Sequence, residues 1–398
     1  MDFDYTDEQK MLRRTVREFA DEHLRPYAAG WDRTAEFPLD LIPILADMGF
    51  MGATIPENYG GSGLDFISVA ILDEEINAAC SSVRTLVSVH SGLVAATLVE
   101  WASDEQKEYY LPKLAKAEMI GCYGLTEPNA GSWAVNQETT VVDDGDDIIV
   151  NGTKIWISNG QLANLCLAFG QSDPEKKHAG IVGFLVEKGT PGFRIGQDLP
   201  KMGGRANHAT ELIFEDCRIP KRNIIGGWGN GFKVAMSALD HGRYSVAAGS
   251  VGLAQECLDL AIAYAKERVT YGKPIAHHQA IQFKIADMAL QVDAARLLVY
   301  RCGHLKNRGI RSTRETAMCK WYATDMANRV AYECMQIFGA YGYSTDYPVE
   351  RLYRDIRVTS IYEGTNEMQQ LIVAGYELGF TRDKATPSQR PKETWEVV

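Results

Sequence analysis

The chain has 398 residues, of which 45% are hydrophobic and 23% charged. This is the composition of an ordinary globular protein, long enough for two or three domains. The formal net charge of −11 argues against nucleic acid as a partner. The eight cysteines are scattered without a C-x-x-C pair and the eight histidines lack ligand-like spacing, so we expect free thiols and no metal site.

The first 120 residues predict helices. Thr6 with Gln9 forms a capping pair at the start of the first helix, and Ser103 with Gln106 forms another. The other helices expected in this segment cover residues 39–48, 66–79 and 84–101. The segment 1–120 is therefore interpreted as an N-terminal helical domain.

The hydrophobic period changes near Met119. Short β-rich runs separated by Gly, Asn, Asp and Pro occupy residues 148–150, 154–157, 165–167, 181–186 and 211–214. This pattern predicts a small all-β domain over 121–228.

Helical periodicity returns from Phe232 onward. The expected helices cover residues 232–268, 280–308, 313–338 and 367–378. Ser312 with Glu315 and Asn366 with Gln369 are interpreted as capping pairs. We assign 229–380 to a C-terminal helical domain and 381–398 to a polar tail.

The start of the chain has neither the basic nor the apolar region of a secretory signal. No window approaches the unbroken apolar length that a membrane span requires. We therefore expect a cytoplasmic protein without membrane insertion.

Glu363 is the strongest candidate for a catalytic residue. It lies between apolar and aromatic neighbours in the loop 361–366, just before a helix start. Gly364 allows the backbone to approach a ligand closely. This placement is typical of a general base, and the alternative is a solvated loop carboxylate.

Four segments carry a resemblance to a known family. They are 122–132 (CYGLTEPNAGS), 151–160 (NGTKIWISNG), 267–275 (ERVTYGKPI) and the Glu363 loop. In this order and at this spacing, they resemble the acyl-CoA dehydrogenases over about residues 1–380. The resemblance implies an α+β, mostly α fold with an N-terminal helical domain, a middle β-barrel-like domain and a C-terminal four-helix bundle. It also implies FAD as the cofactor.

The resemblance implies roles for individual residues. Glu363 would remove the proton alpha to the thioester carbonyl, and its backbone N–H would help to stabilise the enolate. Residues implied near the CoA substrate are Ser132, Asp240, Arg243 and Tyr362. Residues implied for FAD are Tyr123, Leu125, Thr126, Ser132, Trp156, Ser158, Thr365 and Glu367 and, toward the cofactor of a neighbouring subunit, Arg268, Tyr271, Gln279, Gln336 and Gly339.

The chain departs from the family pattern at three positions. Ser158 stands where Thr is more common, Ala340 where many relatives have a second glycine, and Trp133 where an Asp is usual. A strand with a self-capping Thr126 and a surface ion pair of Arg268 are the structural alternatives to flavin binding. No G-x-G-x-x-G follows a strand, so a Rossmann site is not expected.

Arg84 and Ser88 bear on the substrate. They lie four residues apart in an apolar segment and so share a helix face. A buried arginine requires an anionic partner. In glutaryl-CoA dehydrogenases, which the chain resembles here, these positions hold the distal carboxylate, whereas Asn77 stands where decarboxylating enzymes have Glu. An ion pair between Arg84 and a local glutamate at the helix end is the alternative.

We therefore expect FAD-dependent desaturation of a glutaryl-CoA or a substituted succinyl-CoA such as benzylsuccinyl-CoA, without decarboxylation. The resemblance further implies a homotetramer that passes electrons to an electron-transferring flavoprotein. Alternatives are a dehydrogenase of short or branched acyl-CoA, one acting on a carrier-protein thioester, and an acyl-CoA oxidase. A catalytically silent flavin-fold protein or assembly module is a further alternative.

Overall fold

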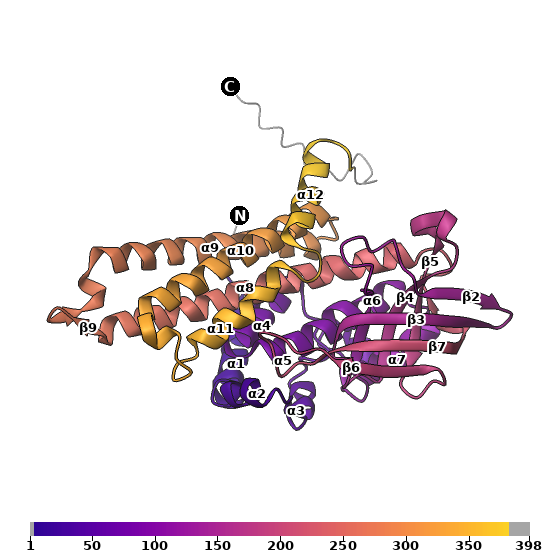
Figure 1. The fold of residues 1–398 in the computed structure, drawn as a ribbon, viewed down its shortest axis with the longest axis horizontal. Coiled ribbons are helices and arrows are strands. Elements are labelled where there is room, and N and C mark those ends of the chain that lie inside the picture. Colours follow the sequence, from indigo (N-terminus) through magenta and orange to yellow (C-terminus); the bar gives the residue numbers. More distant parts are fainter. Residues whose placement is uncertain (1–3, 382–398) are drawn as a thin grey trace.

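The computed structural model describes residues 4–381 and has the expected order of helices, strands and helices (Figure 1). The predicted fold class is confirmed: two helical regions are separated in sequence by a sheet. All eight cysteines are free and buried, as expected for core thiols. The polar tail predicted for 381–398 lies, apart from Thr381, outside the described residues.

Helix α4 packs against α1 and α5 of the N-terminal region and against α8 and α9 of the C-terminal region. Both predicted capping boxes form, at Thr6 with Gln9 and at Ser103 with Gln106. Helix α4 is buried continuously from Ala70 to Ala79. The helices are α1 (Asp7–His23), α2 (Ala28–Thr34), α3 (Leu41–Asp47), α4 (Phe66–Ala79), α5 (Ser81–Val87), α6 (Ala96–Trp101) and α7 (Asp104–Ala115).

A π-helical segment, Ser88–Ala95, joins α5 to α6. The sequence predicted one uninterrupted helix over 84–101, because apolar periodicity does not distinguish α from π winding. The Ser91 carbonyl accepts a hydrogen bond of 2.8 Å from the Thr54 hydroxyl, which fixes the segment to the chain before α4. Such π segments are frequent at functional sites.

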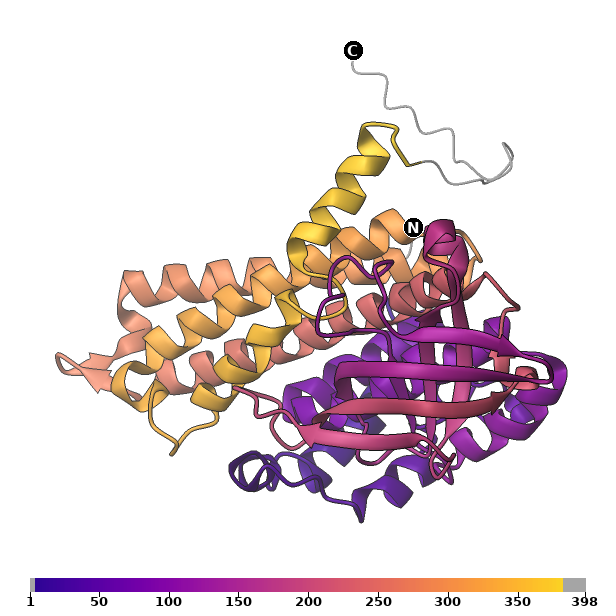
Figure 2. The same cartoon turned by 45° about the vertical axis from the view of Figure 1, so that its right-hand side comes forward.

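The middle region is one mixed sheet with the strand order β6-β7-β3-β2-β4-β5-β8, and β1 pairs parallel to β4. It stands against the N-terminal helices (Figure 2). The strands are β1 (Gly121–Gly124), β2 (Thr140–Asp144), β3 (Asp147–Ser158), β4 (Leu165–Gln171), β5 (Ile181–Glu187), β6 (Phe193–Asp198), β7 (Ala209–Pro220) and β8 (Ile224–Ile225).

Three long helices of the C-terminal region run side by side, and α4 crosses one of them closely (Figure 1). A Cβ placed on Gly252 of α8 would lie 2.0 Å from the carbonyl oxygen of Glu74 in α4. The elements are α8 (Gly231–Glu267), the hairpin β9 (Val269–Thr270) and β10 (Lys273–Pro274), α9 (Gln279–Asn307), α10 (Thr313–Phe338), α11 (Val349–Ile356) and α12 (Asn366–Glu377).

Two predicted capping pairs are wrong. Thr365, not Asn366, is the N-cap of α12, and its side chain accepts from the Met368 N–H at 3.4 Å. The Asn366 side chain is buried and binds α10 instead. Ser312 precedes α10 but its side chain makes no capping bond.

The prediction that no segment has the apolar length of a membrane span is also wrong. Within residues 4–381, the helical segments Ser81–Trp101 and Gly231–Glu267 are long and apolar enough to cross a membrane. In the fold, 83% and 67% of their most apolar windows are buried. Their composition is therefore explained by burial between other helices.

Candidate active site

Glu363 lies in the loop between the 3-10 turn Arg357–Ser360 and α12. Its backbone is in the left-handed region at φ 54°, and Gly364 follows at φ 89°. Its carboxylate oxygen Oε2 is buried without a hydrogen-bond partner. Burial raises the pKa of Glu363 to about 7, although Arg84, Arg243 and Lys320 act to lower it. A carboxylate with this pKa is suited to general-base chemistry near neutral pH.

Cationic side chains hold the backbone of this loop. The Arg243 guanidinium donates from Nε to the Glu363 carbonyl at 3.0 Å. Lys320 donates to the Gly364 carbonyl at 2.9 Å, as does Gln369 at 2.8 Å. Within the described chain, the backbone N–H of Glu363 has no hydrogen-bond acceptor. The loop is therefore fixed while this donor remains available for an oxyanion, as the resemblance implied.

Gly242 of α8 lies directly against the Glu363 carboxylate. A Cβ at this position would stand 2.0 Å from Oε2 and 2.6 Å from Cδ2 of Leu93. The carboxylate and Leu93 therefore leave no room for a side chain at residue 242.

We expect Gly242→Ala to displace Glu363 and reduce kcat by about tenfold or more, since overpacking at a buried contact costs about 1–3 kcal/mol. Single-turnover flavin reduction measures this loss. Gly30→Ala in α2 is the matched control, because a Cβ there meets nothing within 4 Å. Equal rates for both variants would contradict the packing argument.

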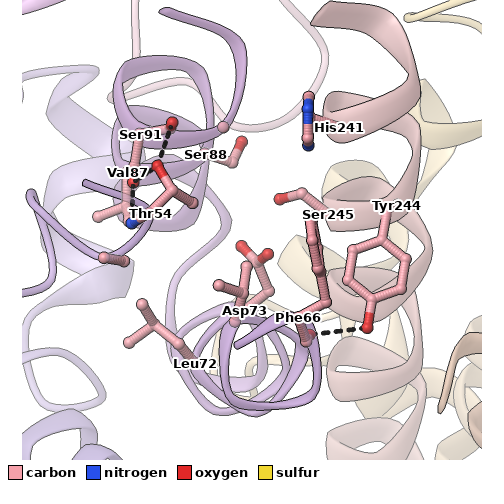
Figure 3. Close-up of a pocket in the computed structure, with 13 residues that line it drawn as sticks. Thr54, Phe66, Leu72, Asp73, Val87, Ser88, Ser91, His241, Tyr244 and Ser245 are labelled. Atoms are coloured by element: carbon pink, nitrogen blue, oxygen red, sulfur yellow. Dashed lines mark hydrogen bonds between the residues drawn. The ribbon is translucent and has the colours of Figure 1, made fainter. Parts of the chain in front are cut away.

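A small pocket lies between α4, the π-helical segment and α8 (Figure 3). Most of its lining is apolar or aromatic, but Asp73, Ser88 and Ser245 contribute polar groups. The full lining consists of Ala53, Thr54, Phe66, Val69, Leu72, Asp73, Val87, Ser88, Ser91, Gly92, His241, Tyr244 and Ser245. The pocket has the apolar character expected for an acyl group.

Arg84 is 2% exposed and lies behind this pocket rather than in its lining. It donates to the Tyr362 hydroxyl at 3.0 Å and to the Ser245 hydroxyl at 2.9 Å. Its Nε lies 3.5 Å from a carboxylate oxygen of Asp73 and makes no hydrogen bond. The anionic partner within the chain is thus Asp73 of α4, and a glutamate at the helix end, the alternative from the sequence, is wrong.

Asp240 and Arg243 occupy neighbouring turns of α8. They form an ion pair at 3.2 Å, and Asp240 also accepts from the Thr313 hydroxyl at 2.6 Å. Arg243 is thus connected both to Asp240 and to the Glu363 loop.

Trp156 is an exposed aromatic side chain at an irregular position of β3. It is 55% exposed, with φ at 63°, within a register irregularity between Lys154 and Ile157 where β3 pairs with β7. Such a bulge redirects a side chain away from the regular alternation of a strand. The exposed indole fits a planar isoalloxazine ring.

The other residues expected near this ring differ in exposure. Tyr123 is buried, and its hydroxyl donates to the Ala235 carbonyl at 3.1 Å. Leu125 is also buried, and its carbonyl accepts from Gln137. Thr126, Ser158 and Thr365 are half-buried, whereas Ser132 and Glu367 are exposed.

The remaining cofactor candidates form a separate group around β9, at the end of the C-terminal helices away from the sheet (Figure 1). Arg268, Tyr271, Gln279, Gln336 and Gly339 are all exposed, Tyr271 at 97%. Arg268 lies over the ring of Tyr341 at 5.8 Å, not in the surface ion pair considered from the sequence. Within one chain, this group therefore lies apart from the strand β3 that carries Trp156 (Figure 1).

Four residues at the site were not predicted from the sequence: Asp73, Gly242, Ser245 and Lys320. Asp73 had a signal, because it is an acidic residue directly after the apolar run 69–72. The other residues act through contacts with distant segments and had no comparable local signal.

Three family profiles cover most of the chain. They are the acyl-CoA dehydrogenase N-terminal domain at residues 6–118, the middle domain at 122–217 and the C-terminal domain at 229–376.

Curated relatives match over nearly their whole length. An acyl-CoA dehydrogenase of Bacillus subtilis is 43% identical over 94% of this chain and 99% of its own. A short-chain specific acyl-CoA dehydrogenase of Clostridium acetobutylicum is 42% identical over the same shares.

Solved structures of related proteins match the fold of this chain over nearly its whole length. Butyryl-CoA dehydrogenase from Megasphaera elsdenii has a TM-score of 0.93 at 40% identity, covering 95% of this chain and 100% of its own. A glutaryl-CoA dehydrogenase with glutaryl-CoA has a TM-score of 0.93 at 38% identity, covering 96% and 98%. A chain from a structure on the electron transferring flavoprotein of Acidaminococcus fermentans has a TM-score of 0.93 at 42% identity, covering 95% and 100%.

A glutaryl-CoA dehydrogenase from Mycobacterium smegmatis, solved with FADH2, has a TM-score of 0.89 at 32% identity and covers 94% of this chain and 95% of its own. The FAD prediction is confirmed at the level of the family by this relative. The prediction of a glutaryl-type substrate is not decided, because butyryl and glutaryl enzymes match equally in fold.

Proposed function

The chain belongs to the acyl-CoA dehydrogenase family of oxidoreductases, and from this premise we propose that it desaturates a short acyl-CoA bearing a distal carboxylate. The observation that carries the reaction is the buried Oε2 of Glu363, which has no hydrogen-bond donor and a pKa raised by burial to about 7. The observation that carries the substrate is Arg84, a buried cation with an unused donor beside the acyl pocket.

In this proposal, different residues abstract the proton, position the loop and hold the flavin. Glu363 takes the proton alpha to the thioester carbonyl, and its free backbone N–H donates to the developing enolate oxygen. Arg243 and Lys320 hold the loop in place through its carbonyls. Bound FAD supplies the hydride acceptor, and Trp156, Thr126 and Ser158 are the residues proposed to hold its ring.

A distal carboxylate would meet polar groups among the residues that line the pocket. Ser88 lines it and offers a hydroxyl, and Arg84 supplies positive charge immediately behind Asp73 and Ser245. The Asn77 amide donates to the Gly249 carbonyl at 2.6 Å and offers no carboxylate, which favours desaturation without decarboxylation. The glutaryl-CoA complex at 38% identity supports this substrate class.

An uncharged short acyl group is the second candidate. Asp73 already neutralises Arg84, so the pocket has no net need of a substrate anion. The short-chain specific relative from Clostridium acetobutylicum and the butyryl-CoA dehydrogenase also favour it.

We further propose a cytoplasmic homotetramer that passes electrons to an electron-transferring flavoprotein. The Acidaminococcus structure supports the acceptor. The separation of the two groups of cofactor residues supports assembly, as does an exposed apolar row on α9, formed by Phe283, Leu290 and Leu297 at seven-residue intervals. Subunits that pair through α9 would cover this row.

Anaerobic flavin bleaching by a panel of acyl-CoA thioesters tests the substrate. We expect glutaryl-CoA and substituted succinyl-CoA to reduce the flavin with a higher kcat/KM than butyryl-CoA does, and the product to retain every carbon. Faster bleaching by butyryl-CoA would select the second candidate. Peroxide formation in air would identify an oxidase, and activity restricted to carrier-protein thioesters would exclude a free CoA substrate.

A further inference from the structure

We propose that Asp73 is a specificity-determining residue of the acyl pocket, an internal counter-ion of Arg84 that competes with the distal carboxylate of an acyl group. This role extends the proposed function and rests on the proposed dehydrogenase reaction. It does not depend on which acyl-CoA is the natural substrate. Asp73 belongs to none of the sequence motifs described above and lies on α4, eleven residues before Arg84.

Asp73 is positioned to face both the arginine and the ligand space. It is 4% exposed, and its carboxylate points from α4 toward Ser245 and the centre of the pocket (Figure 3). Its oxygen Oδ1 lies 3.5 Å from Nε of Arg84. Ser245 lies beside both residues, because its hydroxyl accepts from Arg84 at 2.9 Å and it lines the same pocket as Asp73.

Arg84 and Asp73 form an ion pair in which Nε of Arg84 does not donate a hydrogen bond. The Nε of Arg84 is buried and makes no hydrogen bond, although Asp73 lies nearby. Arg84 thus retains an unused donor while its charge is balanced. A Cβ placed on Gly249 of α8 would stand 2.8 Å from this Nε, so the guanidinium is confined on the α8 side. An anion reaching Arg84 from the pocket therefore has to share it with Asp73.

Burial raises the pKa of Asp73 to about 6, and Arg84 and Ser245 act against this rise. A substrate carboxylate beside Asp73 would repel its charge and favour the protonated form. Protonated Asp73 no longer competes for Arg84 and offers a hydrogen bond. The groups facing Asp73 are Arg84 from α5, Glu74 from α4, His241, Tyr244 and Ser245 from α8, and Tyr362 and Glu363 from the loop before α12.

The experiment compares kcat/KM for glutaryl-CoA with kcat/KM for butyryl-CoA in the FAD-loaded enzyme. Asp73→Asn keeps the shape of the side chain and removes its charge. We expect it to raise the glutaryl/butyryl ratio about tenfold or more, since it removes a like charge that repels the bound substrate anion. A ratio within twofold of wild type, or a lower one, overturns the proposal.

Glu75→Gln is the matched control. Glu75 is a buried carboxylate on the same helix, but it pairs with Arg13 and Arg17 and does not line the pocket. We expect this variant to leave the ratio unchanged. An equal rise in both variants would show a general effect of removing a buried charge from α4 and would overturn the role of Asp73.

A second measurement follows how the ratio depends on pH, first in the wild-type enzyme and then in Asp73→Asn. Asp73 gains its proton as the pH falls through about 6, so the glutaryl/butyryl ratio should rise from pH 7.5 to pH 5.5, and titration of Glu363 cancels because both substrates need it. In Asp73→Asn the ratio should be flat. A flat wild-type ratio overturns the proposal, whereas a wild-type preference for butyryl-CoA with the expected shifts refutes only the dicarboxylic substrate.

Discussion

Glu363→Gln should lose turnover by roughly 10²–10⁴-fold, the contribution that a positioned general base makes. The amide has nearly the shape of the carboxylate but cannot accept the alpha proton. The variant should still purify yellow and bind acyl-CoA, because Glu363 does not hold the flavin candidates Trp156 or Thr126. Stopped-flow bleaching of the flavin measures the chemical step, and near-normal bleaching would reject Glu363 as the base.

The pH dependence gives an independent check on the same residue. Proton abstraction requires ionised Glu363, so wild-type kcat should rise with pH through about 7.

The pKa of Glu363 in the folded state is raised from an ordinary value of 4.5. Between these values the unfolded chain loses its proton first, so this group lowers stability as the pH rises from 4.5 to about 7. Glu363→Gln should lack this decline in Tm, and an unchanged decline would contradict the buried setting of the carboxylate.

Local sequence patterns were sufficient for most elements of the fold. Helix α4 begins and ends where apolar runs and turn residues predicted, at Phe66 and Ala79. The capping boxes at Thr6 and Ser103 depend on residues three apart, so they too can be inferred from a short window. The cap of α12 failed because Asn366 is drawn into bonds with Lys320 and Asp325, which are distant in sequence.

For the candidate site too, local features could be predicted from the sequence, whereas contacts between distant segments could not. Glu363 was identified from its own loop, and its loop geometry fits that prediction. The position of Gly242 against the carboxylate and the pairing of Arg84 with Asp73 depend on how α4, α5 and α8 pack together. Periodicity shows that an arginine is buried but not which acid lies next to it. That acid decides whether the arginine is available to a substrate.

Removing one partner of the buried ion pair between β3 and the segment after β1 should destabilise the protein strongly. Lys154 of β3 lies 2.5 Å from Glu127, and the two side chains are 0% and 1% exposed. Glu127 also accepts the backbone N–H groups of Glu138 and Thr139. The pair thus joins the strand that carries Trp156 to the segment that follows Thr126. Burial acts to raise the pKa of Glu127, but Lys154 and these hydrogen bonds hold it below its ordinary value.

Lys154→Met should lower the free energy of unfolding by about 3–5 kcal/mol, because it leaves a buried carboxylate without its cation. Urea unfolding measures the loss, and FAD retention on gel filtration should fall with it. The double variant Glu127→Gln with Lys154→Met should recover part of the loss, since no uncompensated charge remains. Arg194→Met is the control, because its pair with Glu215 is exposed and worth about 1 kcal/mol or less. Equal losses in Lys154→Met and Arg194→Met would mean that the buried pair does not stabilise the flavin-facing strand, and Trp156 would then need another source of its fixed backbone.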